Sequence, residues 1–167
     1  MIAPAHTLIL AVHPTTRGFG WALFEQPASL VDWGIASAKE GRNARLIARF
    51  ERLLERYKPS ILLLEAFEGR GANRSERVQL LCRTFVHHSS CRGMHVSIMR
   101  RDQVARALGL VDSATRRDVA HAVVSRIETL EHRFPRKRKA WLSEDPRQSL
   151  FDAAALALTY FTALGTR

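Results

Sequence analysis

The chain has 167 residues, of which 46% are hydrophobic, which is enough for one domain with a full core but short for two. Its formal net charge of +10 at pH 7 indicates a polyanionic partner, because unneutralised like charges repel one another; a basic protein with no such partner is the alternative. Cys82 and Cys91 lack metal-type or redox-type spacing, which predicts free thiols. We see no signal peptide or membrane span, so we expect a single cytoplasmic domain over residues 1–167.

The hydrophobic pattern predicts alternating strands and helices with short connections. The first part should hold three strands of a meander, a helix and a fourth strand, at residues 7–13, 19–26, 29–37, 42–57 and 61–65. The second part should hold a helix, a strand and two further helices, at residues 74–89, 94–99, 115–130 and 147–164. A meander followed by strand–helix–strand units predicts an α/β fold with a mixed sheet flanked by helices.

Three polar residues interrupt apolar elements. His13 ends a buried strand and precedes a Thr/Gly-rich connection, an arrangement that can hold one ligand at a sheet edge; a half-exposed hairpin histidine is the alternative. Glu65 ends the apolar run 61–64, where a carboxylate is either functional or ion-paired. Asp152 lies in a last helix that is apolar nearly all round, and a buried carboxylate needs a partner.

These three places carry a resemblance to a known family. Residues 9–14 with Gly18, Gly20 and Trp21 resemble the opening strand and hairpin of the RuvC family of Holliday-junction resolvases. Residues 63–65 are similar to the family's second acidic strand end, and residues 152–159 resemble its closing helix. The connecting helices are matched by residues 101–104, Gly109, residues 113–114 and Val119. The resemblance implies a ribonuclease H-like fold, with a mixed five-stranded sheet flanked by helices.

The resemblance also implies a divalent-metal-dependent endonuclease that acts on branched DNA in recombination and repair, as a homodimer without a membrane or a small-molecule cofactor. His13, Glu65 and Asp152 would be catalytic and would hold one or two ions. Where His13 stands the family has an acid that bridges two ions. One imidazole lone pair cannot bridge, and nitrogen favours Mn²⁺ or Zn²⁺ over Mg²⁺. The family's fourth ligand position holds Ser149, with Glu144 and Asp145 nearby; Asp145 followed by proline also fits a helix cap.

Basic residues near this centre are candidates for DNA contacts. The candidates are Arg70, Arg74, Arg77, Arg101, Arg116, Arg117, Arg136, Lys137, Arg138 and Lys139. The last four belong to the charged segment 132–139, for which a merely solvated loop is the alternative. The resemblance adds Phe67 as an aromatic that would push into the base pairs of a junction.

Two functions of different class stay open. One is the metal-dependent endonuclease, favoured because Glu65 and Asp152 occupy buried positions where a pure binding protein gains little from them. The other is a degenerate relative that binds branched DNA without cutting it. A third relation, to actin-like ATPases and sugar kinases, requires a nucleotide cleft between two domains, and this chain has the length of one.

Overall fold

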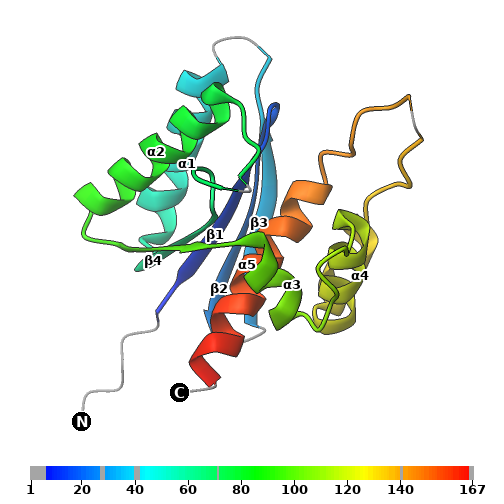
Figure 1. The fold of residues 1–167 in the computed structure, drawn as a ribbon. Coiled ribbons are helices and arrows are strands. Elements are labelled where there is room, and N and C mark those ends of the chain that lie inside the picture. The colour runs from blue at the N-terminus through cyan, green and yellow to red at the C-terminus, as the bar shows by residue number, and fades with distance from the viewer. Residues whose placement is uncertain (1–6, 27–28, 40–41, 71, 140, 166–167) are drawn as a thin grey trace.

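The computed structural model describes residues 7–26, 29–39, 42–70, 72–139 and 141–165 (Figure 1). Its sheet has five strands in the order β3-β2-β1-β4-β5. Their bounds are β1 Ile9–Pro14, β2 Gly18–Gln26, β3 Ser29–Ser37, β4 Ile61–Glu65 and β5 His95–Met99. The first three strands are antiparallel neighbours, whereas β4 runs parallel to both β1 and β5. The predicted mixed five-stranded sheet is therefore confirmed.

The helices follow the predicted order with two differences: the hydrophobic pattern did not predict the short helix that follows β5, and the helix that begins after Thr115 ends earlier than predicted. Their bounds are α1 Arg42–Tyr57, α2 Glu76–Cys91, α3 Arg101–Ala107, α4 Arg116–Arg126 and α5 Gln148–Gly165. Thr115 and Asp118 form the predicted capping box of α4. The prediction that this helix reaches Leu130 is wrong, because Ile127 leaves the helical conformation at φ −128° and ψ 78°. A separate 3-10 helix, Glu128–Arg133, carries Leu130 into the core.

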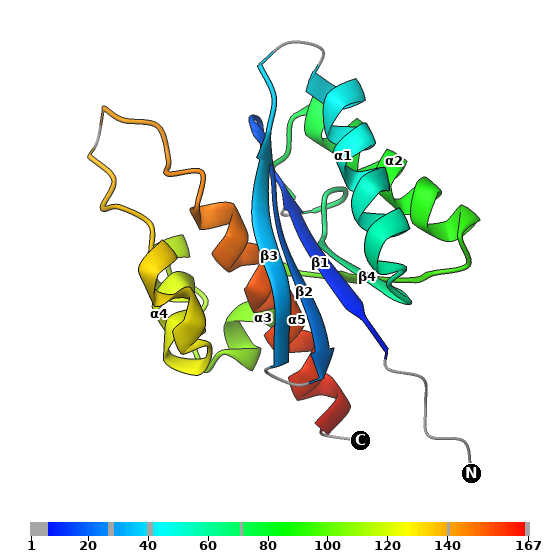
Figure 2. The same cartoon turned by 180° about the vertical axis from the view of Figure 1, so that it is seen from behind.

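Helices cover both faces of the sheet, as Figures 1 and 2 show: α1 and α2 on one side, and α3, α4 and α5 on the other. Successive residues of a strand point to opposite faces. In β1, Leu10 and Val12 pack with α1 and α2, whereas Ile9 and Ala11 pack with α5. The same alternation directs His13, the next odd-numbered residue, to the α5 face.

A glycine in β2 sets how closely α5 approaches this face. Gly20 pairs with His13 across the β1–β2 ladder. A Cβ atom on Gly20 would lie 2.2 Å from the carbonyl carbon of Ser149, far inside any real contact distance. Only glycine therefore lets the first turn of α5 rest on the sheet here. Asp152, about one turn further along α5, is thereby brought close to His13.

The two cysteines are both free, as predicted; Cys82 is buried and Cys91 is exposed. Among the helices of the described ranges, none combines the length and the apolar character that crossing a membrane requires.

Candidate functional site

His13, Glu65 and Asp152 meet on the α5 face of the sheet, although they come from β1, β4 and α5. The His13 Nε2 atom lies 3.1 Å from Oε2 of Glu65, and its Nδ1 atom lies 3.8 Å from Oδ2 of Asp152. Their side chains are 4%, 19% and 10% exposed, respectively. The structure thus brings together all three residues that the sequence singled out, with the imidazole between two carboxylates.

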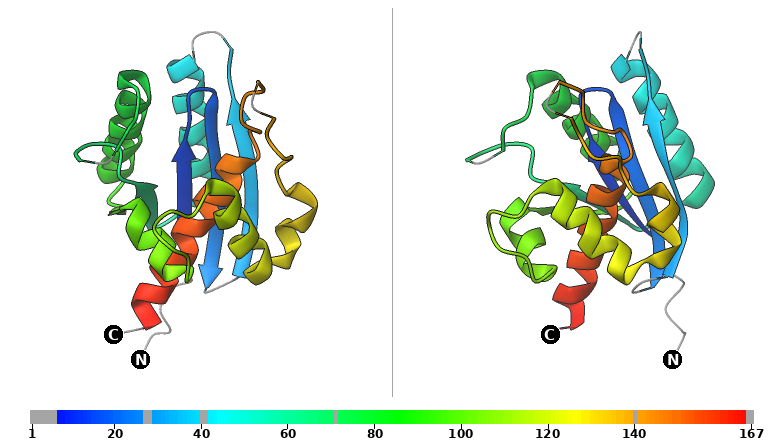
Figure 3. Two further views of the ribbon diagram at one scale, coloured as in Figure 1. Left: turned by 45° about the vertical axis from the view of Figure 1, so that its right-hand side comes forward. Right: turned by 90° about the vertical axis from the view of Figure 1, so that its right-hand side faces the viewer.

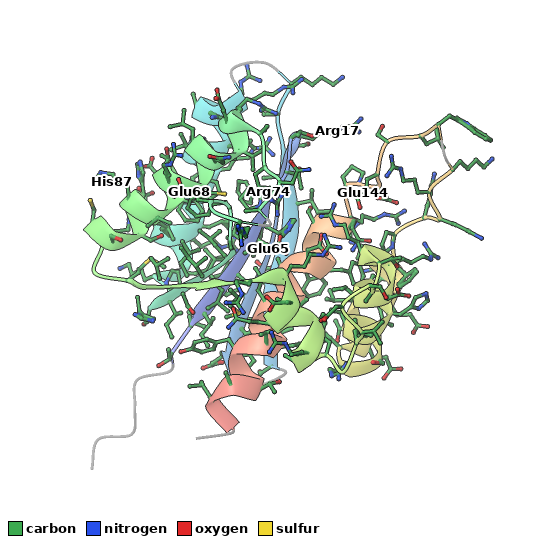
Figure 4. The ribbon with its side chains drawn as sticks, viewed as in Figure 1. Arg17, Glu65, Glu68, Arg74, His87 and Glu144 are labelled. Atoms are coloured by element: carbon green, nitrogen blue, oxygen red, sulfur yellow. The ribbon has the colours of Figure 1, made fainter. Side chains whose placement is uncertain are left out.

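Arg74, which precedes α2, completes one half of this centre, as Figure 4 shows beside Glu65. Its Nη2 atom lies 2.7 Å from Oε2 of Glu65 and 2.8 Å from Nε2 of His13, and its Nη1 atom donates to the Pro14 carbonyl at 2.9 Å. An imidazole nitrogen either donates or accepts. The His13 Nε2 atom is consequently engaged in either tautomer: a protonated Nε2 donates to Glu65, and an unprotonated Nε2 accepts from Arg74.

Arg116, the first residue of α4, completes the other half. Its Nε atom donates to Oδ2 of Asp152 at 3.0 Å, and its guanidinium also pairs with Glu144. Gln148 donates to the second Asp152 oxygen at 3.2 Å. The partner that a buried Asp152 requires is therefore an arginine. Sequence reasoning named Arg74 and Arg116 only as phosphate contacts and missed these pairings; the need of Asp152 for a partner was the available signal.

The electrostatics of the centre favour the charged forms of Glu65 and Arg116. Burial raises the pKa of the Glu65 carboxyl, but the hydrogen bond with His13, the charge of His13 and the Arg74 guanidinium together outweigh it and lower the pKa to about 2. For Arg116, burial works against the charged form, but Asp152 and Glu144 raise its pKa above the usual value. Glu65 and Arg116 are hence charged over the whole physiological pH range.

The donor atoms of this centre do not fit a two-metal site. His13 has one nitrogen engaged with Glu65 or Arg74 and the other buried without a hydrogen-bond partner. The Ser149 hydroxyl, 3% exposed as a residue, donates to the Pro146 carbonyl at 2.7 Å.

The two acids near Ser149 that could replace it as metal ligands are engaged in ion pairs. Asp145 pairs with Arg147 at 2.7 Å, and Glu144 pairs with Arg116. Cationic guanidinium groups thus stand on Glu65 and Asp152, the two carboxylates that a divalent ion would need.

A cleft with a volume of about 790 Å³ lies over the centre. It is lined by five arginines and five acids: Arg70, Arg74, Arg100, Arg101, Arg116, Glu65, Glu68, Asp102, Asp112 and Asp152. Most of these charges neutralise one another; Asp102, for example, pairs with Arg100 at 2.9 Å. Within the described ranges, Arg70 and Arg101 have no carboxylate partner, and both are exposed. These two cations remain free to meet phosphate.

The other predicted DNA contacts separate into three groups. Arg77 donates to the Thr16 carbonyl in the β1–β2 turn, and Arg117 stacks on Phe134 with 4.9 Å between its Cζ atom and the ring centroid. Residues 136–139 are exposed in the loop before α5. Phe67, by contrast, is only 7% exposed and packs into the core between the sheet, α1 and α2. The expectation that Phe67 contacts bases is corrected here, because its ring fills core space.

Comparison with known proteins gives structural neighbours only. No protein-family model and no curated protein matches the sequence. Thermus thermophilus RuvC in complex with a Holliday junction substrate superposes with a TM-score of 0.69 at 20% identity, covering 96% of each chain. A second structure of Thermus thermophilus RuvC gives a TM-score of 0.70 at 18% identity, again covering 96% of each chain. The yeast mitochondrial Holliday junction resolvase Ydc2 superposes with a TM-score of 0.62 at 12% identity, covering 94% of this chain and 78% of that chain.

Because these sequence identities are low, the comparisons establish the fold alone. It is the ribonuclease H-like fold of RuvC-type Holliday junction resolvases, as the resemblance of the sequence had implied. The fold does not determine the chemistry of the centre, which depends on the side chains present there.

Proposed function

We propose that this protein binds branched DNA through the arginine-lined cleft, and that its centre of His13, Glu65 and Asp152 is held by ion pairs without a metal. The observation that carries the proposal is that both carboxylates of the centre are paired with arginines, Arg74 and Arg116. A buried carboxylate costs folding free energy unless it is paired, and here the pairing partners come from the chain. The argument that buried acids favour a nuclease consequently loses its force.

Two further observations support DNA as the partner. The chain carries a net charge of +10, and Arg70 and Arg101 line the cleft without a carboxylate partner among the described residues. Thermus thermophilus RuvC, which shares the fold, is known as a complex with a Holliday junction substrate. Phosphates docking on unpaired cations release counterions, so the affinity should fall steeply with salt concentration.

Metal-dependent cleavage is the second candidate function. It is favoured by the convergence of His13 with Glu65 and Asp152 from three separate elements in one cleft. For this function, DNA phosphates would have to draw Arg74 and Arg116 away from the carboxylates, because guanidinium binds phosphate as readily as carboxylate. The two candidates thus share DNA binding and differ in whether the carboxylates become free.

One experiment separates them. A labelled four-way junction and a linear duplex of the same length are incubated with the protein under Mg²⁺, Mn²⁺ and Zn²⁺ in turn, and both binding and cleavage are measured. We expect tighter binding to the junction than to the duplex and no cleavage that depends on Glu65. Equal affinity for junction and duplex would contradict the binding proposal. Cleavage that Glu65→Gln abolishes would establish the second candidate and refute a metal-free centre.

We also infer a two-fold homodimer. A four-way junction presents two equivalent pairs of strands, and a symmetric partner is matched by two copies of one chain. Sedimentation should show a dimer at micromolar concentration, alone or with junction DNA. A monomer under both conditions would refute the dimer without touching the DNA-binding proposal.

A further inference from the structure

Trp141 is the most exposed large apolar side chain of the described residues, at 78%. Tryptophan has a large apolar ring that proteins normally cover. All other described Phe, Tyr and Trp side chains are buried or half-buried, Phe67 included. An aromatic ring exposed to solvent on a basic surface indicates a binding site for a ligand with a flat apolar face.

The surroundings of Trp141 are cationic. Four successive basic side chains precede it, Arg136, Lys137, Arg138 and Lys139, and all four are exposed. The Lys139 Nζ atom lies 5.7 Å from the Trp141 ring centroid. None of these four cations forms an ion pair with a described residue. The flat indole ring and these unpaired positive charges together match a nucleic acid, whose bases can stack on the ring and whose phosphates can bind the cations.

The loop that bears Trp141 is fixed at its base. The Asp145 carboxylate accepts from the backbone N–H of Arg136 at 3.0 Å and from Arg147 at 2.7 Å, which joins the two ends of the loop. Near the tip, the Leu142 N–H donates to the Lys139 carbonyl at 3.0 Å in a tight turn. The indole is consequently displayed on a closed, hydrogen-bonded loop.

The same loop is tied to the candidate site. Arg17 of the β1–β2 connection donates to the Ser143 hydroxyl at 2.7 Å, and Glu144 pairs with Arg116, which in turn holds Asp152. Figure 4 shows Arg17 and Glu144 on the same side of the sheet, near the end where the β1–β2 turn lies, and Figure 3 shows the loop in orange near the β1–β2 hairpin. Trp141 lies three positions before Glu144 in the chain, a reach of roughly 10 Å.

We propose that Trp141 stacks on a base at the branch point of DNA bound in the cleft, while residues 136–139 hold the adjoining phosphates. The proposal rests on the proposed function and deepens it, because it assigns the recognition of the branch to one side chain. A fully paired duplex keeps its bases stacked on each other, whereas a branch point offers bases whose neighbours have turned away. Trp141 therefore supplies selectivity for branched over linear DNA, and the basic residues supply affinity for either.

The test uses the full chain and a four-way junction that carries 2-aminopurine at the crossover. This base analogue fluoresces when it is unstacked and is quenched when it stacks on an aromatic ring. With wild type we expect a fluorescence decrease on binding, and with Trp141→Ala we expect the loss of this decrease together with roughly tenfold weaker junction binding, within the range known for stacking on one aromatic ring. Duplex affinity and the salt slope should stay unchanged. Trp141→Phe, which keeps an aromatic ring, should retain part of both signals.

Leu142→Ala is the matched control, because Leu142 is the neighbouring exposed apolar side chain, at 50%. It should bind the junction as wild type does. Junction selectivity that survives Trp141→Ala would overturn the inference and leave the proposed function intact. A wild type that fails to bind the junction would instead refute the proposed function, so the two failures are distinguishable.

Discussion

Two charged regions of this molecule differ in what neutralises them. In the centre of His13, Glu65 and Asp152, each carboxylate has an arginine partner supplied by the chain. In the loop 136–139 the basic side chains are exposed and form no ion pair with a described residue. A buried charge needs a partner within the folded protein, whereas an exposed charge is solvated and can bind a partner from outside. The first region hence stabilises the fold, and the second is available for recognition.

The largest effect is expected from breaking the centre on the Asp152 side. Arg116→Ala leaves Asp152, whose side chain is 10% exposed, and Glu144 without their cation. Loss of one partner of a buried pair destabilises strongly, here by about 3 kcal/mol after allowance for the partial exposure of the arginine. Urea unfolding measures this change. Adding Asp152→Asn should recover much of the loss, and the exposed Arg101→Ala should change stability by less than about 0.5 kcal/mol.

If Arg116→Ala unfolds at the wild-type urea midpoint with an unchanged slope, the pairing of Asp152 contributes nothing and the metal-free centre loses its basis.

The Glu65 side of the centre can be tested by pH. The lowered pKa of Glu65, about 2 against an ordinary 4.5, means that the folded state binds its proton more weakly than the unfolded state. Glu65 therefore contributes stability above pH 4.5, and this is lost as the pH falls from 4.5 toward 2. The contribution is about 2 to 3 kcal/mol, because one pKa unit corresponds to about 1.4 kcal/mol.

Urea unfolding of wild type and Glu65→Gln at pH 6 and pH 2.5 measures this contribution. The difference between the two proteins should be large at pH 6 and small at pH 2.5, while the other carboxylates titrate in both proteins alike. A difference that does not change with pH would contradict a charged, paired Glu65.

The identity of the residue at position 13 can be tested by metal binding. His13→Asp adds a third carboxylate to Glu65 and Asp152, which suits a hard divalent ion better than imidazole does. We expect 10 mM Mg²⁺ to raise the Tm of this variant by about 2–4 °C, as for a millimolar site, and to leave wild type unchanged. His13→Ala, which adds no ligand, is the control. A wild type that Mg²⁺ stabilises equally would refute the poor fit inferred for this centre.

Much of the architecture was predictable because local patterns determine it. Alternation in β1 directs His13 to the same face as Ile9 and Ala11, and the apolar surroundings of Asp152 on α5 predicted a buried carboxylate with a partner. The end of α4 was not predictable from capping signals, since no glycine or proline marks it and core packing of Leu130 decides where the chain turns.

The partners of the two acids were harder to predict from the sequence. Arg116 and Asp152 are 36 residues apart, and Arg74 and His13 are 61 residues apart. The side chain of arginine is long, and whether it meets an acid or solvent depends on tertiary packing that no local pattern encodes. For Phe67, the resemblance implied a contact with the bases of a junction, but the ring completes the core on the α1–α2 face. An aromatic after a buried strand has more to gain from burial than from solvent.

The smallest effect, and the sharpest test of the comparison, concerns the two kinds of arginine within the cleft. Arg70→Ala and Arg101→Ala remove cations that have no carboxylate partner in the described ranges, so we expect each to weaken junction binding by about fivefold and to lower the salt slope by about one. Unfolding free energies should stay within about 0.5 kcal/mol of wild type. Arg77→Ala removes a cation that donates to the Thr16 carbonyl outside the cleft lining and serves as the control, with a smaller effect on the salt slope. Filter binding at several salt concentrations measures all three variants. If Arg70 and Arg101 alter stability but leave the salt slope unchanged, unpaired arginines would not be the DNA contacts, and the division between structural and recognising charges would not hold in this cleft.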